Sequence, residues 1–322
     1  GITAVLWTDA IQGIILIVGA VVCVVYILFS MPDGPGQVID IAFSNEKFGL
    51  GSFDLDLSDS TFWVVLIYGI FINLQNYGVD QNYVQRYMAS KSEKAAQRSA
   101  LIGGLIYVPV SALFLFIGTA LFAYYNAADS LPIELQDATK SDRVFPYFIV
   151  NALPAGLSGL LVASIFAAGM STISTSFNSS ATVFLTDYYN KYFKKNASDK
   201  EGMKVLYISS AVISIIGITI AIAMINVKSA LDAWWKLASI FSGGMLGLFL
   251  LGIMSKTKNI IGAIIGTIAG ILVILWLSLS GMLFGEDSIG NYFHTYLTIV
   301  LGTVVIFLTG FIISLLSKNK TE

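Results

Sequence analysis

A ten-residue stretch, 171–180, carries seven hydroxyl side chains and one asparagine inside the apolar segment AAGMSTISTSFNSSATVF. On a helix, three- and four-residue steps place part of this set on one stripe. The stripe consists of Ala168, Ser171, Thr172, Thr175 and Ser179, and its polar neighbours are Ser174 and Asn178. Hydroxyls and freed backbone carbonyls are oxygen ligands that suit hard cations such as Na⁺ without burying a full charge. The alternative is structural: these hydroxyls bond back to the i−4 carbonyl or join helices, and spacing alone favours it.

Two carboxylates, Asp9 and Asp80, lie within apolar segments. A carboxylate in a bilayer costs a few kcal/mol, so such groups usually face a cavity or a partner, and both are candidates for a functional role. The alternatives are ordinary structural roles. Asp80 can pair with Arg86 or lie at the membrane interface, and Asp9 can reach water from the end of its segment.

Amide side chains crowd the stretch NLQNYGVDQNYVQRYMASKS, residues 73–92. Its polar residues are Asn73, Gln75, Asn76, Asp80, Gln81, Asn82 and Gln85, with Gly78 in the middle. Amides at this density favour a helix that is unwound or lined by water over one that faces lipid. A span that ends near Asn76, followed by an interfacial helix, explains the composition equally well.

The elements that must position these residues are membrane helices. Of the 322 residues, 56% are hydrophobic and 12% are charged, whereas soluble domains carry about 25% charged residues. A hydrocarbon core about 30 Å thick requires roughly 20 apolar residues per helix, and the apolar runs are too long for barrel strands. The sequence therefore predicts an all-α integral membrane protein with a single transmembrane domain, 1–322. The predicted spans are 4–30, 61–87, 99–126, 155–185, 204–226, 232–255, 258–281 and 293–317, and 144–154 is predicted to lie at the interface.

Composition excludes several classes of function. The net charge is −2 and no basic block is interleaved with aromatics, so we expect no nucleic-acid partner. One histidine, His294, and one cysteine, Cys23, provide no His/Cys metal cluster or Cys/His catalytic pair. A phosphate-binding loop motif is also missing, and we expect no enzyme. Because the sequence begins Gly-Ile-Thr-Ala, close to an apolar run, we interpret it as the later part of a longer chain.

Lysine and arginine predict the orientation. Most of the 18 basic residues fall on one side of the predicted spans, and the opposite loop, 31–60, is rich in aspartate. The positive-inside rule makes the lysine-rich side cytoplasmic, and an even number of spans places both ends of the chain there.

Three segments, AVLWTDAIQ (4–12), YGVDQNYVQRYMASKS (77–92) and MSTISTSFNSSATVFLTDYY (170–189), resemble signatures of the sodium/solute symporter family, in the family's order and spacing. The second and third are most similar to the branch of monocarboxylate, multivitamin and iodide transporters. The resemblance implies a five-plus-five inverted-repeat fold. Residues 4–30 then correspond to the last helix of the first repeat and 61–255 to the second repeat, with two additional helices following.

The resemblance also implies sodium ligands. In the family's main site they are the carbonyl of Ala168 and the hydroxyls of Ser171 and Thr172, with further carbonyls from a broken helix that precedes this sequence. Some members have another sodium site, whose ligands match Asp9, Ser171, Ser174 and Thr175. A structural role for this second set remains open, because one-sodium members keep the aspartate.

The family's substrate-contacting residues match this sequence less well than its sodium ligands do. Asn73 matches a sugar-contacting asparagine of the galactose-carrying branch, but Asn76 replaces a gating tyrosine there. Trp235 replaces a glutamine, and the lysine expected near Leu105 is missing. A hexose pocket needs many paired polar groups, so a small organic anion, a sialic-acid-like sugar acid or a vitamin-like carboxylate is favoured. Asp80, Gln81 and Arg86 are predicted gating or coupling residues.

The implied function is sodium-coupled import of such a solute by alternating access, across a plasma or bacterial inner membrane. Sodium would favour the state that completes the solute pocket, a coupling of about 1–3 kcal/mol. A neutral-sugar symporter and a proton-coupled carrier of the same fold remain alternatives. A membrane enzyme, a channel and a solute sensor are the rival classes. The sequence does not give the oligomeric state.

Overall fold

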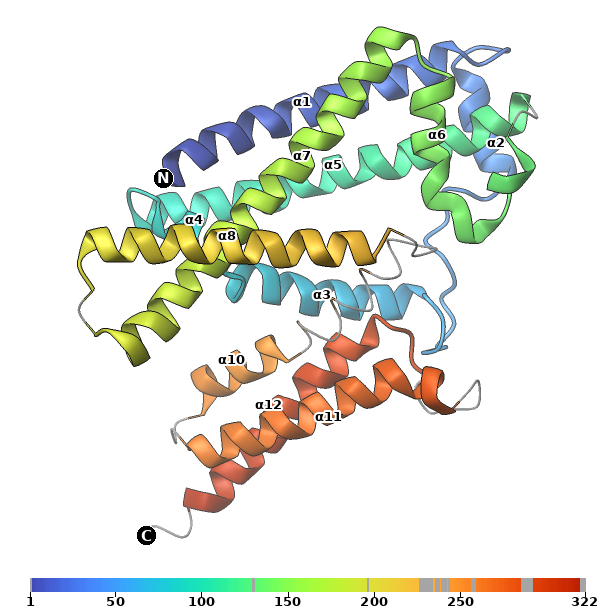
Figure 1. The fold of residues 1–322 in the computed structure, drawn as a ribbon. Coiled ribbons are helices and arrows are strands. Elements are labelled where there is room, and N and C mark those ends of the chain that lie inside the picture. Colours follow the sequence, from blue (N-terminus) through green and yellow to red (C-terminus); the bar gives the residue numbers. More distant parts are fainter. Residues whose placement is uncertain are drawn as a thin grey trace. The chain divides into compact units, whose positions relative to one another are not determined.

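The computed structural model describes residues 2–128, 131–195, 197–225, 234, 238, 242, 244–255, 259–284 and 292–318. Secondary structure in these ranges is helical (Figure 1). The chain divides into two compact units. Unit 1 contains residues 1–48 and 85–229, and unit 2 contains residues 49–84 and 230–322.

Six helices are long and apolar enough to cross a membrane. In unit 1 and then unit 2 they are α1 (Ile2–Phe29), α5 (Glu93–Ala128), α7 (Ala155–Val183), α8 (Asp199–Ala223), α11 (Ile260–Phe284) and α12 (Leu297–Lys318). These helices correspond to six of the eight predicted spans, and the all-α membrane class is confirmed. Much of the predicted span 232–255 lies outside the described residues, which include α10 (Met245–Met254) at its end.

The predicted span 61–87 consists of two helices, α3 (Phe62–Gly78) and α4 (Gln81–Met88), bent by 45° at the break between them. The break at Val79 and Asp80 falls within the amide-rich stretch. A helix that ends at Gly78 and is followed by a second, bent helix fits both interpretations of this stretch, the unwound helix and the span that ends near Asn76.

Two helices of unit 1 are longer than their apolar runs. Helix α5 begins at Glu93, six residues before the predicted boundary, because the polar turns Glu93–Arg98 continue the helix outside the apolar run. Its 36 residues rise about 54 Å, well beyond a hydrocarbon core of about 30 Å. Helix α7 similarly continues into the π-helix η3 (Phe184–Phe193).

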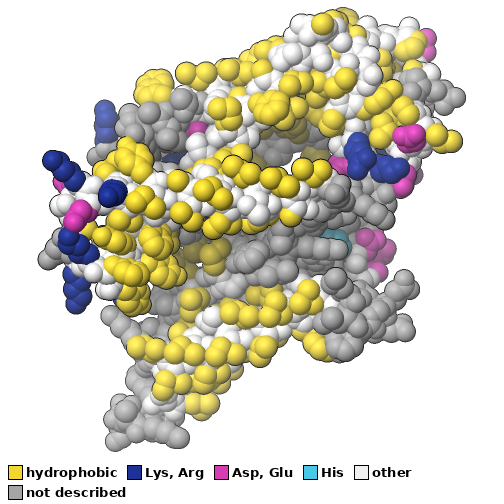
Figure 2. Space-filling view, viewed as in Figure 1, with side chains coloured by type: hydrophobic (Ala, Val, Ile, Leu, Met, Phe, Trp, Pro, Cys, Tyr) yellow, Lys and Arg dark blue, Asp and Glu magenta, His cyan; other side chains and the backbone are white. Residues whose placement is uncertain are grey.

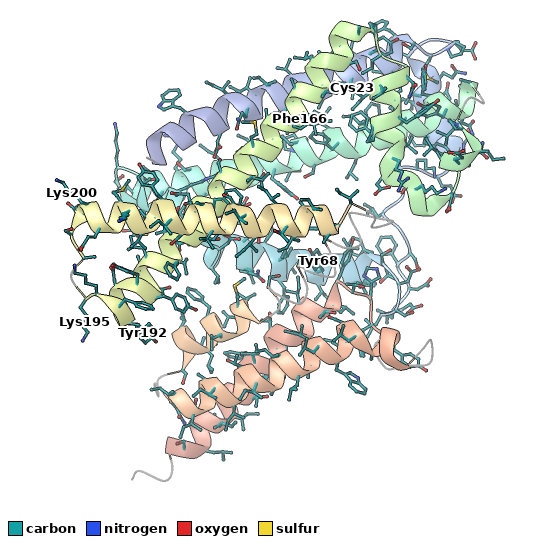
Figure 3. All side chains as sticks on the ribbon, viewed as in Figure 1. Cys23, Tyr68, Phe166, Tyr192, Lys195 and Lys200 are labelled. Atoms are coloured by element: carbon teal, nitrogen blue, oxygen red, sulfur yellow. The ribbon has the colours of Figure 1, made fainter. Side chains whose placement is uncertain are left out.

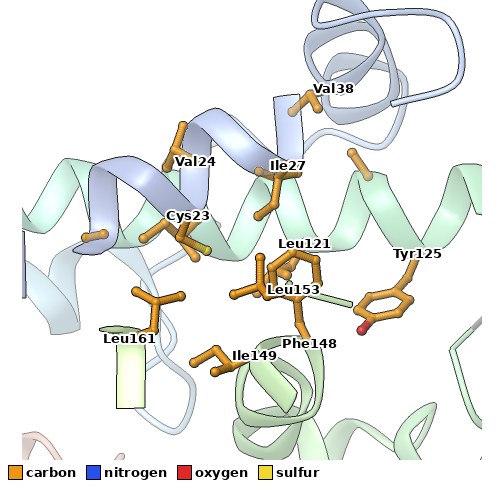
Figure 4. Packing of buried hydrophobic residues seen from close by; sticks show 14 of the residues in the cluster. Cys23, Val24, Ile27, Val38, Leu121, Tyr125, Phe148, Ile149, Leu153 and Leu161 are labelled. Atoms are coloured by element: carbon orange, nitrogen blue, oxygen red, sulfur yellow. The ribbon is translucent and has the colours of Figure 1, made fainter. Parts of the chain in front are cut away.

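The core of unit 1 joins α1, α2 (Gly36–Ser44), α5 and α6 (Val144–Asn151). Cys23, Ile27 and Phe148 are fully buried in it (Figure 4). Ring contacts join Phe148 to Tyr26 and Tyr125. The predicted interfacial segment 144–154 thus contributes its apolar face to this core through α6.

Helices α1 and α7 approach closely at Gly19. A Cβ atom at this position would lie 2.9 Å from Ser164 Oγ and 3.0 Å from Leu161 Cδ2. The Ser164 hydroxyl also donates to the Ile15 carbonyl of α1 at 3.3 Å. Small residues at a crossing allow two membrane helices to pack backbone to backbone. This contact fixes the register of the antiparallel pair.

In unit 2, α11 and α12 pack through glycines spaced four residues apart. A Cβ atom at Gly266 would lie 2.7 Å from the Ile306 carbonyl, and one at Gly270 would overlap the Ile306 side chain. The stacked rings of Tyr68 and Tyr296 join α3 to the residue just before α12.

The surface of unit 1 resembles a surface that faces lipid. Hydrophobic side chains cover the visible face of α8, and basic residues gather at one of its ends (Figure 2). Lys195 and Lys200 lie at this end, together with Tyr192 (Figure 3). An apolar face with a basic end is typical of a membrane helix that ends at a headgroup region.

Candidate cation site on helices α1 and α7

The Asp9 carboxylate of α1 faces two hydroxyls of α7. Ser171 Oγ donates to Asp9 Oδ1 at 2.6 Å, and Thr175 Oγ1 donates to Asp9 Oδ2 at 3.4 Å. The Asp9 side chain is 13% exposed and Thr175 is buried. Four oxygen atoms therefore meet in a largely buried place within unit 1.

Local helical geometry and the Gly19 crossing together build this cluster. Ser171 and Thr175 are separated by four residues, so both lie on the same face of α7. At the crossing, Gly19 of α1 lies beside Ser164 of α7. Because the helices are antiparallel, residues earlier in α1 lie beside residues later in α7, and Asp9 therefore meets Ser171. The cluster depends on a helix contact ten residues away from Asp9.

A guanidinium group completes the cluster. Arg86 Nη2 donates to Asp9 Oδ2 at 2.9 Å and also lies 3.4 Å from Thr175 Oγ1. The Arg86 side chain is 42% exposed. Arg86 belongs to α4, the helix that follows the break at Val79 and Asp80. The sequence placed Arg86 among the gating residues, but the pairing considered for it was with Asp80.

The donor set fits a hard cation. A carboxylate with two hydroxyls offers oxygen ligands, and each hydroxyl keeps lone pairs after donating its proton to Asp9. A cation bound at Asp9 would be repelled by the Arg86 guanidinium, which holds the same carboxylate oxygen. Occupancy of the cluster by a cation is therefore linked to the position of α4.

The other predicted sodium ligands lie on the same helix. Thr172 Oγ1 donates to the Ala168 carbonyl at 3.1 Å, so these two oxygens are close enough to contact one small cation. Ser174 Oγ donates to the Ser171 carbonyl at 3.0 Å rather than to Asp9. The Thr172 bond is the i−4 back-bond that the structural alternative predicts, whereas Ser171 and Thr175 bond across helices. Both interpretations of the hydroxyl stripe thus have local support.

Amide side chains lie near the same cluster. Asn178 Nδ2 donates to Gln85 Oε1 at 3.2 Å. This bond joins α7 and α4 about one helical turn after Thr175 on α7. Within the described residues, Gln85 Nε2 and Gln12 Oε1 are buried without a hydrogen-bond partner. Gln12 was missed as a candidate, although its position three residues after Asp9 places it on the same face of α1.

The remaining predicted residues lie in unit 2 or outside the described residues. Asp80 Oδ1 accepts the backbone N–H of Asn82 at 2.7 Å, where an acidic group stabilises the start of α4, and Gln81 is the first residue of that helix. Asn73 Nδ2 bonds to the Gly69 carbonyl, and Asn76 is half-buried on α3. Trp235 lies outside the described residues.

The family model for the sodium:solute symporter family matches residues 1–270. The chain belongs to this family. Its curated relatives include the sodium/sialic acid symporter NanT of Aliivibrio fischeri (strain ATCC 700601 / ES114), 30% identical over 99% of this chain and 61% of NanT. The sodium-dependent multivitamin transporter of Oryctolagus cuniculus is 30% identical over 89% of this chain and 45% of that protein.

A solved structure of a Na⁺-coupled sialic acid symporter, substrate-bound and outward-open, shares the fold of this symporter-family chain. Its TM-score is 0.85 at 32% identity, over 98% of this chain and 63% of that one. The chain thus spans less than two thirds of the length of the relatives it matches. Family membership and the apolar helices together make it a multi-pass membrane protein.

Proposed function

We propose that the chain acts in sodium-coupled symport, importing a small organic carboxylate by alternating access. The observation that carries this proposal is the Asp9 cluster, in which a buried carboxylate meets the hydroxyls of Ser171 and Thr175 at 2.6 and 3.4 Å. An intramembrane carboxylate surrounded by oxygen ligands is typical of an ion pathway.

The proposal includes two sodium positions, which the arrangement of α7 supports. The main one uses the Ala168 carbonyl with the hydroxyls of Ser171 and Thr172. The second uses Asp9 with Thr175 and Ser174. Ser171 belongs to both, since its hydroxyl bonds to Asp9 while its neighbours Ala168 and Thr172 bond to each other.

The transport step is a change in binding energy, with no covalent chemistry. Sodium entering from outside gains about 2.3 kcal/mol per charge per 100 mV of membrane potential. Its binding would favour the conformation in which the solute pocket is complete. We assign Asp80, Gln81 and Arg86 to gating. The break between α3 and α4 supports this proposal, because Asp80 lies at the break and Gln81 and Arg86 belong to the helix that follows it.

The solute is proposed to be a sugar acid of the sialic acid class, with other monocarboxylates and vitamin-like carboxylates as competitors. Relatives named for sialic acid and for vitamins support a carboxylate in preference to a neutral sugar. Asn73, Asn76 and Trp235 are the proposed contacts. We further propose that the protein lies in the plasma or inner membrane with both chain ends cytoplasmic, as the basic residues indicate.

Uptake in proteoliposomes tests the proposal directly. Radiolabelled N-acetylneuraminate, lactate, biotin and galactose would each be offered with an inward sodium gradient and with sodium replaced by choline at fixed pH. We expect concentrative uptake of a carboxylate in sodium only. Equal uptake in choline with a pH gradient would instead establish proton coupling.

Ser171→Ala is the decisive variant, and Ser180→Ala is its matched control on the same helix, where the serine is exposed. We expect the half-saturating sodium concentration to rise in Ser171→Ala only. An unchanged sodium dependence in this variant would exclude the site, and preferential uptake of galactose would overturn the solute class.

A further inference from the structure

Aromatic rings form two exposed ladders on the π-helix η3. Phe184, Tyr188 and Tyr192 follow one another at four-residue steps, with ring centroids 6.1 and 6.5 Å apart. A second pair, Tyr189 and Phe193, stacks at 6.1 Å. Tyr188, Tyr192 and Phe193 are 55%, 69% and 74% exposed, so unit 1 leaves much of their area uncovered. Contiguous exposed apolar surface of this kind marks a place that contacts a membrane or another molecule.

Exposed lysines surround the end of these ladders, on both sides of the connection between η3 and α8. They are Lys191, Lys194, Lys195, Lys200 and Lys204. Lys191 Nζ lies 5.5 Å from the centroid of the Tyr192 ring, and Lys194 Nζ bonds to Glu201 Oε1 at 2.6 Å. Among the described residues, no ion pair involves the other three lysines. Two of these, Lys195 and Lys200, lie at the same end of the molecule as Tyr192 (Figure 3).

Acidic side chains in this segment offset the lysines only in part. Residues 187–204 contain five lysines and three carboxylates, Asp187, Asp199 and Glu201. Glu201 is already engaged, because it accepts from Lys194 and from the backbone N–H of Ser198 in the capping box of α8. The ammonium groups that remain available outnumber the remaining carboxylates, so the segment attracts anions.

Helix α8 places these lysines at the surface of the membrane. Residues 205–223 carry no charged side chain and rise about 28 Å, close to the thickness of a hydrocarbon core of about 30 Å. Lys204 therefore lies at the boundary of this core, and Lys200 lies about one turn outside it, among the headgroups. The bond from Lys194 to Glu201 holds the end of η3 at the same level.

The ladders lie along the headgroup layer because η3 leaves the core obliquely. Helices α7 and η3 form one continuous stretch of 39 residues, Ala155–Phe193, which rises about 55 Å. A bilayer with its headgroups is about 40–45 Å thick, so a perpendicular helix of this length would project beyond it. Figure 1 shows α7 crossing α8 at an angle instead of running beside it. A tilted η3 keeps its tyrosines in the interfacial layer, where this residue type is enriched.

Phosphate groups are the ligands that this arrangement fits. Lysine ammonium groups bind phosphate as point charges, and each lysine near an anionic membrane surface strengthens binding roughly fivefold. A zwitterionic headgroup carries its own cation beside the phosphate, whereas an anionic headgroup leaves the phosphate charge unbalanced. A segment with an excess of lysines therefore favours the anionic headgroup.

We propose that the end of η3 and the first turns of α8 bind anionic phospholipids of the surrounding bilayer. The residues of this η3–α8 cluster are Tyr188, Tyr192, Lys195, Lys200 and Lys204. The lysines hold the phosphates, and the rings keep η3 in the headgroup layer. Since η3 continues α7 directly, the bound lipid holds the end of the helix that carries the hydroxyls of the candidate cation site. This binding requires no sodium, so it holds or fails independently of sodium coupling.

The test compares the lipids around two positions on α8. Met203→Cys and Ile222→Cys are each labelled with bimane, since both native side chains are exposed and the other cysteine, Cys23, is fully buried. The protein is placed in phosphatidylcholine liposomes that contain a small share of either phosphatidylglycerol or phosphatidylcholine with a nitroxide near the headgroup end of one acyl chain. Bimane quenching by the two nitroxide lipids gives the local lipid preference. We expect a preference for phosphatidylglycerol of at least about fivefold at position 203 and of less than about twofold at position 222.

Charge removal separates this cluster from the other basic segment of the chain. Lys195→Gln/Lys200→Gln should lower the preference at position 203 at least about threefold. The matched control is Lys91→Gln/Lys94→Gln, which removes the same charge from two exposed lysines before and within the first turn of α5 and should leave that preference unchanged.

A second measurement leaves all lysines in place. Raising choline chloride from about 0.1 M to about 1 M shortens the Debye length from about 10 to about 3 Å and should reduce the preference at position 203 to less than about twofold. Equal preferences at positions 203 and 222, an equal loss in the Lys91/Lys94 control, or a preference that persists at high salt would each overturn the proposal.

Discussion

Replacing Arg86 by glutamine should raise the apparent sodium affinity of the Asp9 cluster. Arg86 Nη2 lies 2.9 Å from Asp9 Oδ2, with the two side chains 42% and 13% exposed. At this distance the attraction between unit charges is about 1.4 kcal/mol in water and about 6 kcal/mol at an effective dielectric constant of 20. Solvent exposure of Arg86 and desolvation of Asp9 reduce the net value to about 1–2 kcal/mol.

A sodium ion that binds Asp9 must compete with this ion pair. The apparent affinity for sodium is the intrinsic affinity multiplied by the fraction of molecules whose Asp9 carboxylate is free, and removing the pair raises this fraction. A net 1–2 kcal/mol corresponds to roughly a 5- to 30-fold lower half-saturating sodium concentration in Arg86→Gln. The assay is the sodium dependence of solute uptake in proteoliposomes, with choline replacing sodium at constant ionic strength.

Arg98→Gln is the matched control, because Arg98 is an exposed arginine on α5 and the variant loses the same charge. Its sodium dependence should equal that of the wild type. The double variant Arg86→Gln/Asp9→Asn should lose the gain in affinity, since the competing carboxylate is gone. An unchanged or higher half-saturating concentration in Arg86→Gln would refute the competition.

Three further predictions follow from the same structure. Asp9→Asn should lower the Hill coefficient for sodium towards one, and a coefficient that stays above one in the uptake assay would remove Asp9 from the coupling. Gly19→Leu should lower the thermal unfolding midpoint and weaken sodium dependence, because its side chain would overlap Ser164 Oγ, 2.9 Å from the position of a Cβ atom. Gly13→Leu, with nothing within 4 Å, should do neither, and equal loss in both would contradict the crossing argument. Burial lowers the pKa of His294 below its ordinary value of 6.5, so the unfolded chain protonates first as the pH falls. Stability should therefore decrease as the pH falls from about 6.5 towards that lowered pKa, and His294→Gln should flatten the pH dependence of thermal unfolding.

The helices were predictable because their signal is local. A run of about 20 apolar residues defines a membrane span whatever surrounds it, and α7 begins at Ala155, as predicted. Helix boundaries formed by polar turns were harder to predict from hydrophobicity. Helix α5 begins before its apolar run because polar turns continue the helix. The amide-rich stretch left two readings open, and the 45° bend between α3 and α4 is compatible with both.

The candidate site was predictable only in part. Family signatures placed Asp9, Ser171 and Thr175 in one ion site, and the structure brings the three together. The partner of Arg86 could not be read from spacing. Asp80 is six residues away in sequence, yet its carboxylate accepts the N–H of Asn82, while Arg86 pairs with a residue 77 positions earlier.

The sequence by itself determined that this is an all-α membrane protein and which residue types are available to hold a cation. Only the tertiary structure decided that Asp9 shares its carboxylate between the hydroxyls of α7 and the guanidinium of α4. Hydrophobicity and helical period act over neighbouring residues, so a sequence displays them directly. The Asp9 contacts depend on the register of α1 against α7, which is set by the close approach at Gly19 and Ser164 and exists only once both helices are packed.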